Sequence, residues 1–136
     1  MANAIYDKAR ESFLSANPTI DWDTDTIKCS LVRSSAYTPN MATDQFLSSV
    51  ATRVADSAAL ASKTVTAGVA DAADITFTAV GAGASFQYVL IWKDTGNAAT
   101  SPLIALFDTM TGLPYTPSGG DITIAWDNGA NKIFKL

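Results

Sequence analysis

The chain has 136 residues, and only 16% of them are charged, against a usual share of about 25%. So few charges indicate that an assembly covers much of the surface, although a neutral surface on an ordinary small β protein gives the same composition. The net charge of −4 and the nine scattered basic residues argue against a nucleic-acid partner, whose phosphates need clustered cations.

The first predicted element is a short amphipathic helix within residues 1–16. Ile5, Ala9 and Phe13 recur at intervals of four, which places them on one helical face. Asn3 is a suitable N-cap, so we expect the helix to start there and to end before the Asn-Pro pair that follows.

Residues 20–25 are expected to form a turn that contains Asp21, Asp23 and Asp25. Carboxylates at alternate positions resemble the opening of a calcium loop. The sequence lacks both the glycine and the bidentate glutamate that such a loop needs further on. A solvated turn is therefore the favoured interpretation, and we predict no metal site.

A first strand follows, in which Ile27, Cys29 and Leu31 alternate with other residues. Cys29 is the single cysteine of the chain, so it has no partner for an intramolecular disulfide. We expect it to be an inert thiol in the core.

The segment 43–54 is ambiguous. Phe46, Leu47, Val50 and Val54 recur at helical spacing behind a threonine that can cap a helix. The pattern favours a helix over an irregular segment.

From residue 62 onward the apolar residues recur with a period of two, which is typical of half-buried strands. We expect one strand around residue 65 and another around residue 75. Residues 86–92 and 103–107 are apolar on both faces, so these two strands are predicted to lie in mid-sheet and to form the core with Trp92 inside.

The C-terminal residues predict a β-hairpin, because an Asn-Gly pair lies between two alternating apolar runs. Two turns compete. A two-residue loop places Ile133 on the inner face of residues 122–126, whereas a three-residue loop with a left-handed Gly129 places Phe134 and Leu136 there. We favour the three-residue loop, because it gathers more large apolar side chains on one face.

About seven strands are expected, centred near residues 27, 65, 75, 88, 105, 124 and 133. This spacing indicates a mainly β fold, either a β-sandwich or a jelly-roll-like arrangement, with a short N-terminal helix and a C-terminal β-hairpin. We expect residues 1–136 to form a single domain with a sandwich core at 26–136.

The chain contains no histidine, which removes the commonest general base from the available catalytic groups. A pair of carboxylates could still act together, and the candidates are Asp71, Asp74, Asp94 and Asp108. Each lies beside a turn or a strand end, where solvation is the commoner role of a carboxylate. We therefore predict no enzyme activity and no cofactor.

No apolar run approaches the roughly 20 residues of a membrane span, and the first residues lack the basic start of a secretory signal. We expect no membrane partner. The chain is expected to be made and kept in a cytoplasm until it joins a larger assembly.

Exposed aromatic rings are the remaining candidates for binding, since flat faces stack on sugars or contact another subunit. Trp22 and Tyr115 lie in predicted loops and are the better surface candidates. We favour contact with a subunit over contact with a carbohydrate.

Three segments carry a family resemblance: AIYDKARESFL at residues 4–14, IDWDTDTIKCSLV at 20–32 and GGDITIAWDNGANKIFKL at 119–136. Together they resemble small structural virion proteins of tailed bacteriophages. The resemblance implies a decoration, or cement, protein that binds the major capsid protein on the outside of the head and stabilises the shell. It also implies a homo-oligomer, commonly a trimer, that is made in the cytoplasm of a host bacterium and located in the virion.

We expect the contacts of such a protein in the N-terminal helix, in the turn that follows and in two loops. The predicted interface residues are Ile5, Tyr6, Trp22, Asp23, Tyr37 and Tyr115. A tail, baseplate or receptor-binding fibre component is the alternative within a virion, and a carbohydrate-binding module is the alternative outside it.

Overall fold

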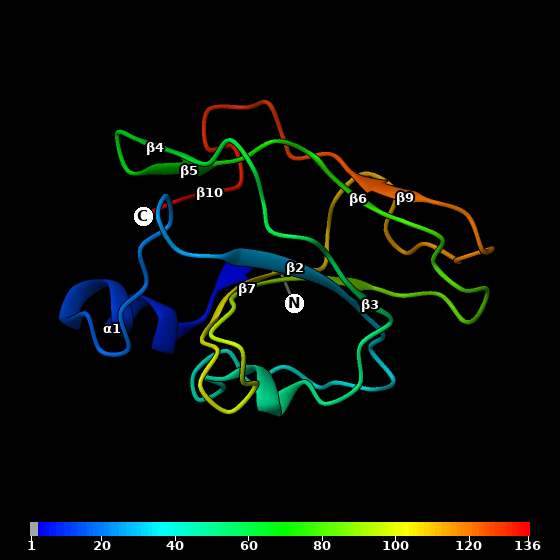
Figure 1. Ribbon diagram of the computed structural model, residues 1–136, viewed down its shortest axis with the longest axis horizontal. Helices are drawn as coiled ribbons and strands as arrows, with labels where there is room; N and C mark the ends of the chain where they lie inside the picture. The colour runs from blue at the N-terminus through cyan, green and yellow to red at the C-terminus, as the bar shows by residue number, and fades with distance from the viewer. Residues whose placement is uncertain (1–2) are drawn as a thin grey trace.

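The computed structural model describes residues 3–136 as a mainly β fold with one short α-helix, which confirms the predicted fold class (Figure 1). The elements follow in chain order: β1 Ala4–Ile5, α1 Asp7–Ser15, β2 Ile27–Val32, the 3-10 helix Leu47–Ser49, β3 Ala55–Asp56, β4 Thr64–Thr66, β5 Val69–Asp71, β6 Ile75–Phe77, β7 Tyr88–Lys93, β8 Leu103–Phe107, β9 Ile122–Ile124 and β10 Phe134–Lys135.

The largest sheet has five strands in the order β1-β8-β7-β2-β3, and its neighbouring strands are antiparallel. β2 and β7 pair along their full six residues, from Ile27 opposite Lys93 to Val32 opposite Tyr88. β7 and β8 lie inside the sheet, and every residue of β8 is buried. The prediction of two mid-sheet strands covered on both faces is confirmed, and Trp92 is buried as predicted.

Two small sheets make a second layer, drawn above the five-stranded sheet in Figure 1. One contains β10, β5 and β4, and the other contains β6 and β9. The layers meet through aromatic side chains: Phe107 on β8 lies with its ring centroid 6.0 Å from that of Trp126, just after β9. The predicted sandwich is therefore uneven, with one long sheet and a layer of short strands.

The predicted strand around residue 65 is two strands joined by a tight turn. Ala67 and Gly68 have φ values of 53° and 78°, as a two-residue hairpin loop of the I′ type requires at both central positions. The backbone reverses at this point, and β4 pairs with β5 along Thr64–Thr66.

The predicted C-terminal hairpin is wrong. β9 pairs with β6, and β10 pairs with β5 in the other small sheet, so residues 125–133 cross between two sheets. Lys132 adopts a positive φ of 46°, and the predicted left-handed bulge at Gly129 does not form. Ile133 is buried, whereas Leu136 is 59% exposed. The favoured three-residue loop predicted the opposite, with Leu136 on the inner face and Ile133 on the outer face.

The N-terminal helix is shorter than predicted, because residues 4–5 pair with β8 as strand β1. The helix begins at Asp7, and Asn3 does not cap it. The Asn3 side chain instead accepts hydrogen bonds from the backbone N–H groups of Asp108 and Thr109, at 2.8 and 2.9 Å. A long-range contact thus replaces the local cap that the sequence suggested.

The predicted helix at 43–54 is also wrong, since only a single 3-10 turn forms there. The backbone N–H groups of Leu47 and Ser48 donate to the carbonyl oxygens of Ser101 and Ala98 rather than to their own segment. Leu47 and Val50 are buried as core residues. The apolar spacing therefore indicated which residues are buried, and not that they form a helix.

Among residues 3–136, no helix combines the length and the apolar character needed to cross a bilayer.

Candidate interaction surface

The six predicted interface residues lie in different environments. Asp23 is exposed, and Tyr115 is 38% exposed. The other four are buried, namely Ile5, Tyr6, Trp22 and Tyr37. Contacts with residues distant in the sequence cover all four, but Ile5 and Trp22, like the exposed Asp23, line the grooves described below.

Tyr6 and Tyr37 belong to a buried chain of hydrogen bonds. Their hydroxyl oxygens are 2.9 Å apart, and the Tyr37 hydroxyl donates to Asp44 Oδ2 at 2.6 Å. Burial raises the pKa of both phenols above its usual value, so both rings stay neutral at physiological pH. Asp44 also accepts the backbone N–H of Asn40 at 2.9 Å. These contacts hold the Tyr37 loop against the start of the chain.

Trp22 is held between the turn after α1 and the small sheet. Its Nε1 donates to the carbonyl oxygen of Asp71 at 3.0 Å, and its ring meets Phe134 nearly edge-on, with the centroids 5.3 Å apart.

Among residues 3–136, Tyr115 is the one aromatic side chain that is exposed, and its ring lies 5.8 Å from that of Phe86. The flat exposed faces expected of a sugar platform are thus reduced to one ring.

The acidic turn at 21–25 is built by its own carboxylates. Asp25 Oδ2 accepts the backbone N–H of Asp21 at 2.8 Å and pairs with Lys93 Nζ at 2.9 Å. The side chains of Asp21 and Asp23 hydrogen-bond to each other, which lowers the pKa of Asp21 and raises that of Asp23. The described residues include no group of three or more His, Cys, Asp or Glu side chains placed to hold a metal ion.

Asp74 and Asp94, two of the four carboxylates considered for catalysis, contact other groups of the fold. Asp74 Oδ1 accepts the backbone N–H of Trp126 at 2.9 Å. Asp94 pairs with Lys28 at 2.7 Å, and this hydrogen bond lowers the pKa of Asp94. Asp71 ends β5, and Asp108 follows β8. Asp74 and Asp94 thus bind groups of the fold itself.

The largest exposed apolar side chains gather around the helix and the C-terminal strand. Leu14, Leu136 and Val65 are 90%, 59% and 55% exposed, respectively. They come from α1, from the residue after β10 and from β4. Scattered surface leucines are ordinary, but apolar side chains from three elements that line adjoining grooves make this surface the candidate for an interaction site.

Two grooves join these side chains into one surface. One, of about 390 Å³, is lined by Phe13, Val65, Phe134 and Leu136 together with the turn at 19–23. The other, of about 330 Å³, shares Phe13 and Leu136 with the first and adds Leu14, Arg10 and Lys135. We name this surface the α1–β10 strip. Its exposed or half-buried apolar members are Phe13, Leu14, Val65, Phe134 and Leu136.

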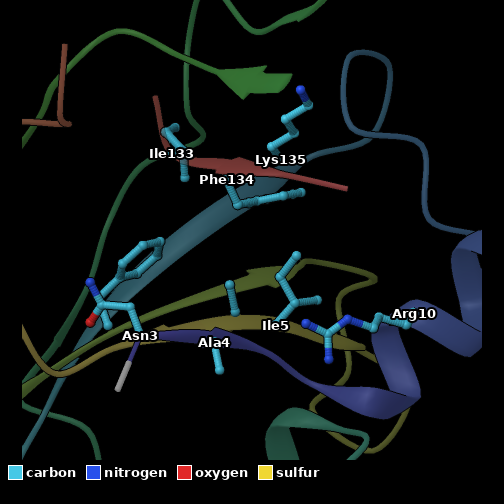
Figure 2. A pocket seen from close by; sticks show the side chains of 9 residues that line it. Asn3, Ala4, Ile5, Arg10, Ile133, Phe134 and Lys135 are labelled. Atoms are coloured by element: carbon cyan, nitrogen blue, oxygen red, sulfur yellow. The ribbon is translucent and has the colours of Figure 1, made fainter. Parts of the chain in front are cut away.

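Beside the strip, a cleft of about 200 Å³ separates the edge strand β1 from the edge strand β10. Figure 2 shows Ile5 and Arg10 on the lower side of this cleft and Phe134 on the upper side. The strip therefore lies where the five-stranded sheet and a small sheet expose neighbouring edges.

Reasoning from sequence missed Leu14, Val65 and Leu136 as surface residues. Leu14 falls beside the Ile5, Ala9 and Phe13 stripe of the predicted helix, and this offset was the available signal that it points away from the core. Val65 and Leu136 carry no such signal, because their exposure depends on which strands pair.

Comparison of the sequence with protein-family models and with curated proteins gives no match.

Proposed function

We propose that the protein is a non-enzymatic structural subunit of a tailed-phage virion, most like a decoration protein on the outside of the head. The observation that carries this proposal is the α1–β10 strip, an apolar surface on a small β domain with few charges. A surface of this kind is typical of proteins that act by contact with other subunits.

The resemblance of residues 4–14, 20–32 and 119–136 to small virion proteins supports the location. The structure brings parts of all three segments together at the strip, where Trp22 contacts Phe134 and Phe13 lies with its ring centroid 6.4 Å from that of Phe134. We expect the partner to be the major capsid protein, together with other copies of the chain. Many modest contacts of this kind add up to a large stabilisation of a shell.

The test is to separate phage heads, tails and free protein by density and to detect this chain in each fraction. We expect it to sediment with intact heads. Recovery with tails would favour a tail, baseplate or fibre component, and recovery with neither particle would reject a virion role.

A pair of variants shows whether the strip makes the contact. Leu14→Ser removes the most exposed apolar side chain, and we expect it to reduce the amount bound to heads. Tyr115→Ser is the matched control, because Tyr115 is the one large apolar side chain among residues 3–136 that is exposed outside the strip. Loss of binding in the control alone would place the contact at the Tyr115 loop.

A further inference from the structure

The α1–β10 strip has opposite charges at its two ends. The groove of about 330 Å³ carries Arg10 and Lys135, and the groove of about 390 Å³ carries Asp21 and Asp23. Neither basic residue lines the second groove, and neither aspartate lines the first. Because the grooves meet at Phe13 and Leu136, the surface runs from basic through apolar to acidic.

A surface with this order is complementary to itself. A two-fold rotation about an axis through the apolar middle places the basic end of one copy on the acidic end of the other, twice. The apolar side chains of both copies then face each other between two sets of opposite charges. We propose that the α1–β10 strip binds a second copy of this chain across such a two-fold axis, with Lys135 of each copy facing the Asp21 and Asp23 pair of the other.

The acidic end suits a cation from another copy. Asp21 and Asp23 are both exposed and line the same groove, so two acidic side chains share a small area that an ammonium group can pair with. Lys135 is exposed on the edge strand β10, where its position in the sheet is held by the pairing of Lys135 with Val69. Arg10 is held at the same end by Asp7, with Nη1 and Oδ1 3.1 Å apart.

This contact refines the proposed function, since it names one partner of the assembly subunit and the surface that binds it. It predicts a dimer, whereas the resemblance implies a trimer. A trimer formed by rotation about a three-fold axis joins two different surfaces of each copy, so it does not place one strip on another.

The first experiment is light scattering of the purified protein over a range of concentrations. We expect a mass that rises toward twice the monomer value of 14.3 kDa. Leu14→Ser should weaken the association at least about tenfold, because it removes the most exposed apolar side chain of the strip. A mass that stays monomeric, or that reaches a trimer, overturns the two-fold contact.

The second experiment exchanges the charges. Lys135→Glu and Asp23→Lys should each weaken self-association about tenfold or more, because each places like charges at both ends of the contact. An equimolar mixture of the two variants should associate again, since both ends of a mixed dimer then carry opposite charges. Failure of the mixture to associate overturns the proposed pairing, provided that circular dichroism shows both variants folded.

Tyr115→Ser is the control here as well, and it should leave the dimer unchanged. These measurements use the pure protein, so their outcome is independent of its sedimentation with heads. A dimer that does not bind heads rejects the proposed function alone, and a head-bound protein that is monomeric in solution and insensitive to the charge exchange rejects the two-fold contact alone.

Discussion

The two layers of the molecule differ in the length of their strands and in how far those strands are buried. β2, β7 and β8 have five or six residues each and are buried through most of their length. The strands of the small sheets have only two or three residues, and β4 is exposed throughout. The long sheet therefore provides the core, and the thin layer leaves apolar side chains at its edge for contact with another molecule.

The largest loss of folding stability should come from a cavity in the five-stranded sheet. Leu90 on β7 is fully buried, and Leu90→Ala is expected to lower the free energy of unfolding by about 2 to 5 kcal/mol, because the surrounding side chains cannot fill the space. Val65→Ala on the exposed strand β4 should change it by less than about 0.5 kcal/mol. Urea denaturation of both variants checks the contrast, and equal losses would contradict it.

An intermediate effect is expected where the layers meet. Phe134 is half-buried against Trp22 and Phe13, so Phe134→Ala should lower the free energy of unfolding by about 1 to 3 kcal/mol, less than a fully buried aromatic residue would lose. Leu136→Ala is the neighbouring control. Because the Leu136 side chain is exposed, this substitution should change the free energy of unfolding little. If both substitutions cost as much as Leu90→Ala, the C-terminal strand belongs to the core after all.

The smallest effect concerns a charged pair at the end of the long sheet. The hydrogen bond from Lys28 lowers the pKa of Asp94, so the pair stabilises the fold above the unfolded pKa of about 3.9. That contribution is lost as the pH falls through the lower folded pKa.

Lys28→Met should therefore make the free energy of unfolding less dependent on pH between about 5 and 2, by at most about 1 kcal/mol. Lys28→Arg keeps the positive charge and should retain most of the dependence. Unfolding by urea at several pH values measures the slope, and a wild-type slope in Lys28→Met would remove the role assigned to this pair.

The sequence predicted elements well where their signal was local. Residues 27–32 form β2 and residues 103–107 form β8, as predicted. The alternation at 27–32 suggested one exposed face, but Ser30 and Val32 are buried as well. Cys29 is buried as predicted, and burial raises its pKa. The helix predicted from the apolar spacing at 43–54 does not form. Leu47 and Val50 instead reach the core from an irregular segment that hydrogen-bonds to residues 98–101.

Candidate contact residues were harder to predict. Trp22 and Tyr37 lie in loops, which favoured exposure, yet Trp22 bonds to Asp71 and Tyr37 to Asp44 inside the fold. Leu136 looked like a core residue and is exposed. In each case the environment is set by a segment at another place in the chain, which single-residue properties do not encode.

The amino-acid sequence by itself determined the mainly β character, the two central strands and the short N-terminal helix, because periodicity reflects the burial of one face within a single segment. Only the tertiary structure decided that β9 pairs with β6 and β10 with β5 rather than with each other. The physical reason is that every strand offers the same backbone donors and acceptors, so the choice of partner depends on how Trp126, Ile133 and Phe134 pack against distant segments.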